Sequence, residues 1–477
     1  MATRVLQARD AAYRELRAGI SAIQEELHVR PEFPPDVQAA GEQDAAAARM
    51  PDLDLTHLDF VTLDPAGAMD LDQAMHLETA GDGYVLHYAI ADVMAFVRPG
   101  DPVDEEAHQR GESLYGANSK VPLHPKVLSE GAASLLPDED RPAFVWTIGL
   151  DAEGAMTAAR VERARVRSRA QLDYVGVQRE INRAPEGSTL ALLRTVGELR
   201  IAQEAARGGV SLPMPAQEID LTDDRYRLEY REMLPVESWN AQLSLLTGFA
   251  AASMMIEGRV GILRTLPPAP DDAVQQLRRT ARALGIDWPR ATEHAEFIRS
   301  LDPSRPAEAA MVVACTRLLR GAGYAAFREH VPDQPEHAAL ASPYAHVTAP
   351  LRRLVDRYGL EICAALCAGT EVPAWVLERM DRLPEVMQDS GRKSRAYENA
   401  VVNLVEALTL RSRVGETFEG VVTEVEHDDQ REGTVMVREP AVEAPVVSAS
   451  PLPVGEDVTV TLAEADPATR KVRFTLG

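Results

Sequence analysis

The chain has 477 residues, of which 45% are hydrophobic and 26% charged, a composition that excludes a mostly disordered chain or a fibrous repeat. With 74 acidic against 50 basic residues, the net charge of -24 excludes a diffuse basic coat for nucleic acid. It still allows a local cluster of arginines to form a positive channel.

Three features of the sequence predict a cytoplasmic protein without membrane contact. The chain has only 3 cysteines, an odd number that favours a reducing compartment. Residues 1–16 carry charges where a signal peptide needs an apolar stretch. The longest near-apolar run, residues 245–256, is shorter than the roughly 18 residues that suggest a membrane span.

Residues 1–50 are expected to form a short helical N-terminal element. Its first helix carries one apolar stripe at spacings of three and four, made of Tyr13, Leu16, Ile20, Ile23 and Leu27. Prolines break the pattern over residues 28–35, and a second helix is expected at residues 36–49. Two interpretations stay open: a small nucleic-acid-binding module, or a helical hairpin packed on the main body or on a partner subunit.

The remaining chain alternates between strand-like and helical segments, which predicts an α+β fold. Strands are expected within residues 52–151 and 217–229, because β-branched and aromatic residues are frequent there. Apolar periodicity predicts helices over residues 160–207, 236–258, 271–284, 306–321, 351–368 and 383–411. Five short strand-like segments after residue 413 predict a small C-terminal β-barrel of the OB type.

The segment HLDFVTLDPAGAMDLDQA, residues 57–74, carries the clearest chemistry. It places Asp64, Asp70 and Asp72 at a strand end and in the loop that follows. Crowded carboxylates repel one another unless a cation lies between them, and oxygen ligands favour Mg²⁺ or Mn²⁺. An EF-hand fits poorly, because Met69 occupies its glycine position. A solvated acidic turn is the other interpretation of this spacing alone.

Five segments in matching order resemble the RNB family of exoribonucleases, which includes ribonuclease II and ribonuclease R. They are the TLD–DLDQA loop, HYAIADVMAFVRPGDPVDEEAHQRGESLY, KVPLHPKVLSEGAASLLPDEDRPAF, YAHVTAPLRRLVDRYG and SRAYENA. The resemblance spans residues 56–412. It implies an RNB catalytic domain with a funnel-shaped channel at residues 51–412, and an OB-fold RNA-binding domain at residues 413–477.

The resemblance also implies the activity. Members of the family hydrolyse single-stranded RNA processively from the 3′ end, release nucleoside 5′-monophosphates and use a divalent metal, here Mg²⁺ or Mn²⁺. A monomer is the expectation from the family. Two alternatives remain: a catalytically weakened RNA-binding protein on the same fold, and an unrelated metal-dependent phosphoesterase that uses the same aspartates.

Site residues are carried over by motif position. Asp64, Asp70 and Asp72 would hold the metal, and Asp72, Arg352 and Glu398 are the catalytic candidates. Tyr115 would stack on bases at the 3′ end. Arg353 is a further candidate for substrate binding, with support of the site as the other interpretation.

Departures from the family pattern limit these expectations. Gln73 replaces the fourth aspartate; its amide oxygen could bind a second cation, although less well than a carboxylate. On a helix that carries a glutamate in the family, the alignment puts Gln242 in its place, with Glu237 as the other candidate. No cold-shock domains are evident in the sequence, which suggests an open entrance that tolerates structured RNA.

Overall fold

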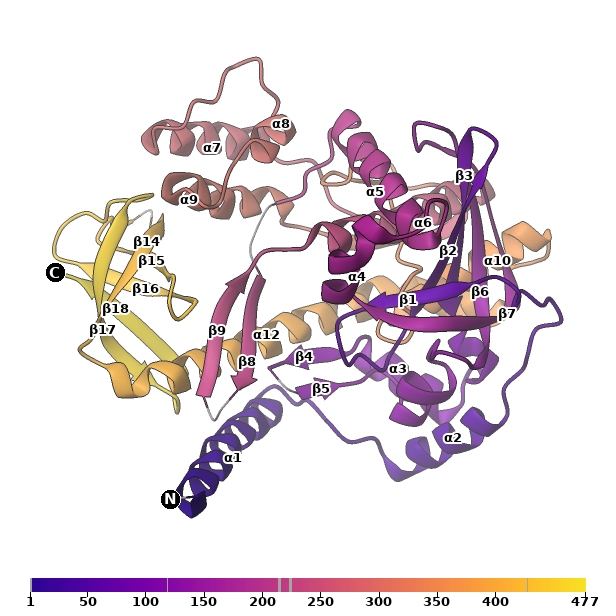
Figure 1. Ribbon diagram of the computed structural model, residues 1–477, viewed down its shortest axis with the longest axis horizontal. Coiled ribbons are helices and arrows are strands. Elements are labelled where there is room, and N and C mark those ends of the chain that lie inside the picture. The colour runs from indigo at the N-terminus through magenta and orange to yellow at the C-terminus, as the bar shows by residue number, and fades with distance from the viewer. Residues whose placement is uncertain (1, 118, 213–215, 223–224, 427) are drawn as a thin grey trace.

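The computed structural model describes residues 2–117, 119–212, 216–222, 225–426 and 428–477. The side chains of residues 2–13 (Tyr13 of the predicted stripe included), 119, 216, 218–222 and 225–227 lie outside the description. Two β-barrels stand at opposite ends of the molecule, and one long helix runs between them (Figure 1). The fold is thus of mixed helices and sheets, as predicted.

The first barrel forms the centre of the larger body. Its strands are β1 (Phe60–Asp64), β2 (Gln73–Ala80), β3 (Gly83–Ala91), β6 (Asp140–Leu150) and β7 (Met156–Asp173). Neighbouring strands are antiparallel except β1 and β7, which run parallel and place Asp64 opposite Asp173. Large side chains such as Trp146 and Tyr88 are fully buried against it. The acidic loop therefore begins where β1 leaves a closed barrel.

The helix predicted over residues 160–207 is wrong for its first part. β7 extends to Asp173, and the helices α4 (Tyr174–Glu180) and α5 (Thr189–Ala206) follow it. Arginine and alanine favour helices intrinsically, but pairing of β7 with both β6 and β1 overrides that preference. The missed signal was an alternation of buried Ala164, Val166 and Ser168 with partly exposed arginines.

Helices and short hairpins lie around this barrel and between it and the second barrel (Figure 1). They are α3 (Pro102–Arg110), β4 (Leu114–Gly116), β5 (Ser119–Val121), β8 (Ala216–Thr222), β9 (Arg225–Arg231), α6 (Pro235–Gly258), β10 (Val260–Thr265), β11 (Gly323–Arg328), β12 (Glu336–His337), β13 (Ser342–Pro343), α10 (Leu354–Ala368) and α11 (Ala374–Arg379). The predicted strands near residues 217–229 and the helices near 236–258 and 351–368 are confirmed. No helix within the described ranges is long and apolar enough to cross a membrane.

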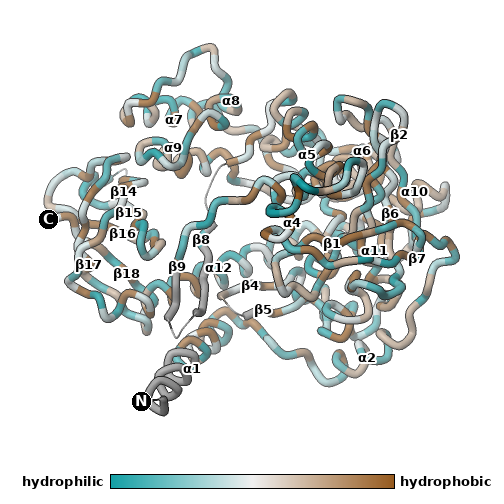
Figure 2. Tube along the Cα trace, in the orientation of Figure 1, coloured by the Kyte–Doolittle hydropathy of each residue, from teal (hydrophilic) through white to brown (hydrophobic). Residues whose placement is uncertain are grey.

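Three helices form a separate small cluster beside the second barrel, namely α7 (Asp271–Ala283), α8 (His294–Arg299) and α9 (Pro306–Cys315). Hydrophilic and hydrophobic residues alternate along α7 (Figure 2), and its apolar Leu277 and Ala281 are buried. The helices predicted from residues 271 and 306 are therefore confirmed, with the second one ending at Cys315.

The C-terminal barrel consists of the five strands predicted from the sequence. They are β14 (Thr417–Val425), β15 (Glu432–Val437), β16 (Val442–Ser448), β17 (Asp457–Asp466) and β18 (Lys471–Leu476). The long helix α12 (Leu383–Leu410) leads into it, and Leu404, Val405 and Leu408 join the barrel's apolar core. This packing connects the barrel to the helix that runs between it and the larger body (Figure 1).

The N-terminal element consists of α1 (Ala2–Glu26) and α2 (Pro35–Ala46). Leu16, Ile20 and Ile23 of the predicted stripe are buried in the same core as α12, where Leu404 lies directly against Gly19. Glu26 also forms an ion pair with Arg470 of the C-terminal barrel at 2.7 Å. The element thus packs on the main body, and its binding of nucleic acid stays a prediction.

A buried carboxylate of α12 makes stability depend on pH. Glu406 is 4% exposed and accepts a hydrogen bond from Gln217 Nε2 at 2.9 Å. Burial raises its pKa to about 7, so the folded protein retains a proton that the unfolded chain releases near pH 4.5. Stability should therefore fall as pH rises from about 4.5 to 7, and Glu406→Gln should recover roughly 3 kcal/mol at pH 8.

Urea unfolding of this variant at pH 4.5 and pH 8 measures the effect. The matched control is Glu398→Gln, which changes an exposed glutamate of the same helix and should leave stability unchanged at both pH values. An equal shift for Glu406→Gln at both pH values would contradict the assignment to a buried proton.

Candidate active site

Side chains from four distant segments line a cavity of about 420 Å³ at the end of the first barrel. The segments are the loop between β1 and β2, the strand β4, the face of α6 and the loop before α10, and Tyr174 at the start of α4 joins them. Their polar members are Asp64, Asp70, Asp72, Gln73, Tyr115, Tyr174, Glu237, Asn240, Ser244 and Arg352. The structure thus brings together all three predicted metal-binding aspartates, Gln73, Tyr115 and Arg352.

Asp72 is buried and Asp64 is partly buried, and their charges are only partly compensated. The Oδ2 atom of Asp64 is buried and has no hydrogen-bond partner among the described residues. Burial, with the nearby Asp70 charge, raises the pKa of Asp64 to about 6. Burial also raises the pKa of Asp72 to about 8, although Arg352 and the Leu351 N–H oppose the shift. Burial therefore disfavours the ionised form of both carboxylates, and a bound cation would offset that effect.

Asp72 connects the acidic loop to the segment before α10. Its Oδ1 accepts a hydrogen bond from the Leu351 N–H at 2.8 Å, and its Oδ2 lies 3.6 Å from Arg352 Nε. The Arg352 side chain is 40% exposed, so its guanidinium reaches the open part of the cavity. This arrangement places a cationic fork beside the carboxylates without neutralising it completely.

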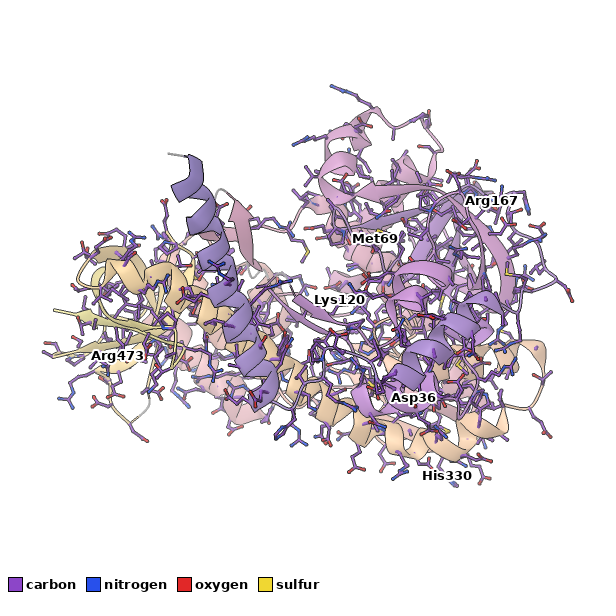
Figure 3. All side chains as sticks on the ribbon, turned by 90° about the horizontal axis from the view of Figure 1, so that it is seen from below. Asp36, Met69, Lys120, Arg167, His330 and Arg473 are labelled. Carbon is purple, nitrogen blue, oxygen red and sulfur yellow. The ribbon has the colours of Figure 1, made fainter. Side chains whose placement is uncertain are left out.

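Asp70 has a different environment, because it is already paired. Lys120 Nζ lies 2.7 Å from Asp70 Oδ2, with both side chains largely buried. Figure 3 labels Lys120 and Met69, the neighbour of Asp70, near the middle of the molecule. Within the part of the chain that the structure describes, no three acidic, histidine or cysteine side chains form a ready-made metal cage. The three aspartates share a cavity, but Asp70 is held by a lysine.

Gln73 is fixed by hydrogen bonds at both ends of its amide. Its Nε2 donates to the Thr348 carbonyl at 2.7 Å, and its Oε1 accepts from the Tyr88 hydroxyl. The amide oxygen would have to give up the tyrosine to reach a cation in the cavity.

Arg353 lies differently from its neighbour Arg352. It makes a two-pronged ion pair with the fully buried Asp356, at 2.8 Å for each contact. Asp356 also accepts the Ala349 N–H at 2.7 Å, and buried His124 Nδ1 contacts the Leu351 carbonyl at 3.1 Å. These contacts fold the loop that presents Arg352, so Arg353 supports the site instead of facing the cavity.

Tyr115 stands on the β4–β5 hairpin, directly opposite Lys120. Its side chain is among the cavity-lining set, and the residue is 42% exposed. Directly opposed residues in an antiparallel pair project from the same face. The hairpin therefore presents an aromatic ring and an ammonium group side by side at the site.

The structure separates two residues that the motifs connected with the site. Glu398 is exposed on α12 and lies outside the set of described side chains that line the cavity. Gln242 is buried on the far side of α6, where its Nε2 donates to Glu204 at 2.5 Å. Glu237 lines the cavity instead and forms an ion pair with Arg231 at 2.9 Å.

The cavity contains functional candidates that the sequence motifs did not indicate. Tyr174 and Asn240 hydrogen-bond one another at 3.4 Å, and Ser244 Oγ lies 2.9 Å from Thr348 Oγ1. Helical spacing alone could have grouped Asn240 with Glu237 and Ser244, since they are three or four residues apart. Nothing local to the sequence indicated that this face of α6 meets the acidic loop.

The donor set fits one divalent cation better than two. The unpartnered oxygen of Asp64 and the buried carboxylate of Asp72 would hold a hard cation through oxygen atoms. Asp70 is shared with Lys120, and Gln73 is engaged at both ends.

Models of two known protein domains match the parts of the chain that form the two barrels. The model of the RNB domain matches residues 53–366, and the model of the RNase II-type exonuclease C-terminal S1 domain matches residues 416–477. The Arabidopsis thaliana exosome complex exonuclease RRP44 homolog A is 26% identical over 378 residues, which are 76% of this chain and 40% of that protein. Ribonuclease R of Escherichia coli K12 is 27% identical over 411 residues, covering 80% and 49% respectively. The chain thus spans half or less of the length of these relatives.

Solved structures share the fold. The apo form of Mycoplasma genitalium RNase R superposes with a TM-score of 0.85 at 20% identity, over 97% of this chain and 78% of that one. The same protein in complex with ribose-methylated single-stranded RNA gives 0.84 at 20% identity, with the same coverage. Yeast Ssd1, described as a pseudonuclease, gives 0.71 at 15% identity, over 90% and 55%.

Proposed function

Because the chain belongs to the RNB family, we propose that it is an exoribonuclease that hydrolyses single-stranded RNA processively from the 3′ end to nucleoside 5′-monophosphates. Mg²⁺ or Mn²⁺ is the proposed cofactor. The observation that carries the proposal is the meeting of Asp64, Asp70 and Asp72 with Tyr115 and Arg352 in one cavity. Tolerance of structured RNA stays a prediction.

Each residue has a defined part in this reaction. Arg352 offers two parallel N–H groups to the scissile phosphate and stabilises the charge that develops on it. Asp64 and Asp72 would hold the cation; when bound, it neutralises phosphate charge and lowers the pKa of the attacking water. Asp356 and Arg353 keep the loop of Arg352 in place. Phosphate contacts make binding salt-dependent and largely independent of sequence.

Tyr115 should contribute to binding through stacking on a base near the 3′ end. Tyr115→Ala should weaken the binding of short single-stranded RNA roughly 10-fold, since a stacked base contributes about 1–3 kcal/mol. Tyr115→Phe retains the ring and is the matched control, which should bind as the wild type does. Fluorescence anisotropy with labelled RNA in EDTA measures both. Equal weakening by the two variants would contradict stacking.

A 5′-labelled RNA of mixed sequence tests the proposed activity. With Mg²⁺, the label should move through a ladder to a short 5′ end product, and EDTA should prevent this. Gln73, tied to Thr348 and Tyr88, favours a second candidate, a catalytically weakened RNA-binding protein. Tight RNA binding without shortening, in both Mg²⁺ and Mn²⁺, would support that candidate instead.

A further inference from the structure

Lys120 is the cationic side chain that holds Asp70. Its Nζ lies 2.7 Å from Asp70 Oδ2 and 3.6 Å from Glu130 Oε1, and its side chain is only 21% exposed. The chain has four lysines among its 50 basic residues, so a lysine at this position is unusual for this sequence. A lysine ammonium is a compact charge with three donors, and in this respect resembles a small cation more than the planar guanidinium of arginine does.

The charges around the cavity explain how the Lys120–Asp70 ion pair would affect cation binding. When cation binding leaves Asp64, Asp70 and Asp72 all ionised, Arg352 and Lys120 reduce the charge of these five side chains to one net negative charge, and Gln73 adds none. One divalent cation then makes the group positive before RNA phosphate arrives, whereas a second would make it strongly positive. Without Lys120, two negative charges would remain, and Asp70 would be free to bind a cation.

Neighbouring contacts hold Lys120 in its ion pair with Asp70. The β4–β5 hairpin pairs Lys120 with Tyr115, which lines the cavity, so the ammonium is delivered from a defined strand position. The amide of Gln73 is held by Thr348 and Tyr88 and does not compete for Asp70. Of the three aspartates, Asp64 and Asp72 then remain to bind a cation.

We propose that Lys120 takes the place of a second divalent cation, so that this site binds one such ion, with the Lys120 ammonium neutralising Asp70. The inference rests on the proposed function, because the cation would serve the proposed hydrolysis of RNA. It concerns cation binding by the ligand-free protein, however, and can be measured without RNA.

Titration of the full chain with Mn²⁺ alone, followed by the electron paramagnetic resonance of free Mn²⁺, tests this inference. The wild type should bind one Mn²⁺, and Lys120→Met should bind a second ion or bind the first at least about 10-fold more tightly, because Asp70 is released. Lys120→Arg keeps the charge and should behave as the wild type. Adding Asp70→Asn to Lys120→Met should remove the gain.

Lys126→Met is the matched control. Lys126 also approaches Glu130, at 3.7 Å, but its side chain is 69% exposed and its ion pair is with Glu130 and not with Asp70. This variant should leave Mn²⁺ binding unchanged. If Lys120→Met does not fold, as judged by circular dichroism, Lys120→Gln serves in its place.

Two results would overturn the inference: two Mn²⁺ bound by the wild type, or identical titrations of the wild type and the charge-removing Lys120 variant. Failure of the proposed function looks different. In that case RNA would not be shortened, while the Mn²⁺ titrations would still separate Lys120→Met from Lys126→Met.

Discussion

Asp72→Asn should reduce RNA cleavage in Mg²⁺ at least about 100-fold. Replacing groups that only support a metal ligand typically costs 10–100-fold, and Asp72 is proposed to hold the cation itself. Asparagine retains an oxygen that can accept the Leu351 N–H, so the loop before α10 should keep its conformation. Single-turnover cleavage of 5′-labelled RNA by the two proteins measures the loss.

The stability of the same variant provides its control. Burial raises the pKa of Asp72 to about 8, so in EDTA the folded protein keeps a proton that the unfolded chain loses above about pH 4. The wild type therefore loses stability as pH rises between these values, whereas asparagine has no proton to lose. Asp72→Asn should melt at a higher temperature than the wild type at pH 7 in EDTA, and equally near pH 4. If Asp72→Asn were less stable than the wild type at pH 7, misfolding would explain its loss of cleavage.

Arg352→Lys should lower the cleavage rate about 10²–10³-fold and change RNA affinity far less. Lysine keeps the positive charge but loses the planar fork that would hold the phosphate in the transition state. The Arg352 side chain is 40% exposed, so its replacement should leave thermal stability nearly unchanged. Cleavage under single-turnover conditions and RNA binding in EDTA separate the two effects.

The adjacent arginine is the matched comparison. Arg353→Met would leave Asp356 buried without its partner, which should destabilise the protein by about 3–5 kcal/mol. Urea unfolding measures this loss. If Arg352→Lys destabilised the protein as strongly as Arg353→Met, or cleaved RNA at the wild-type rate, the division of roles between the two arginines would be wrong.

Segments with strong periodicity were predictable from the sequence. α6, α12 and the five strands of the C-terminal barrel lie where the apolar patterns indicated, because each element satisfies its own local preference. β7 was missed since its arginine-rich alternation becomes meaningful only when β1 and β6 lie on both sides. Local propensity cannot report pairing with a strand about 100 residues earlier.

The candidate site was likewise predictable from the sequence only in part. The motifs indicated Asp64, Asp70, Asp72, Tyr115 and Arg352, and the structure gathers them in one cavity. Spacing could not reveal that Lys120 holds Asp70, because this ion pair joins a hairpin to a separate loop. It also could not choose between Gln242 and Glu237, since that choice depends on which face of α6 meets the cavity.

The most direct test of the central claim compares one RNA sequence in linear and circular form. The wild type with Mg²⁺ should release nucleoside 5′-monophosphates from the linear RNA and leave the circle intact, because hydrolysis requires a free 3′ end. Chromatography of the released products and gel analysis of the circle measure both outcomes. Opening of the circle, or no release from either RNA, would contradict an exoribonuclease that acts from the 3′ end.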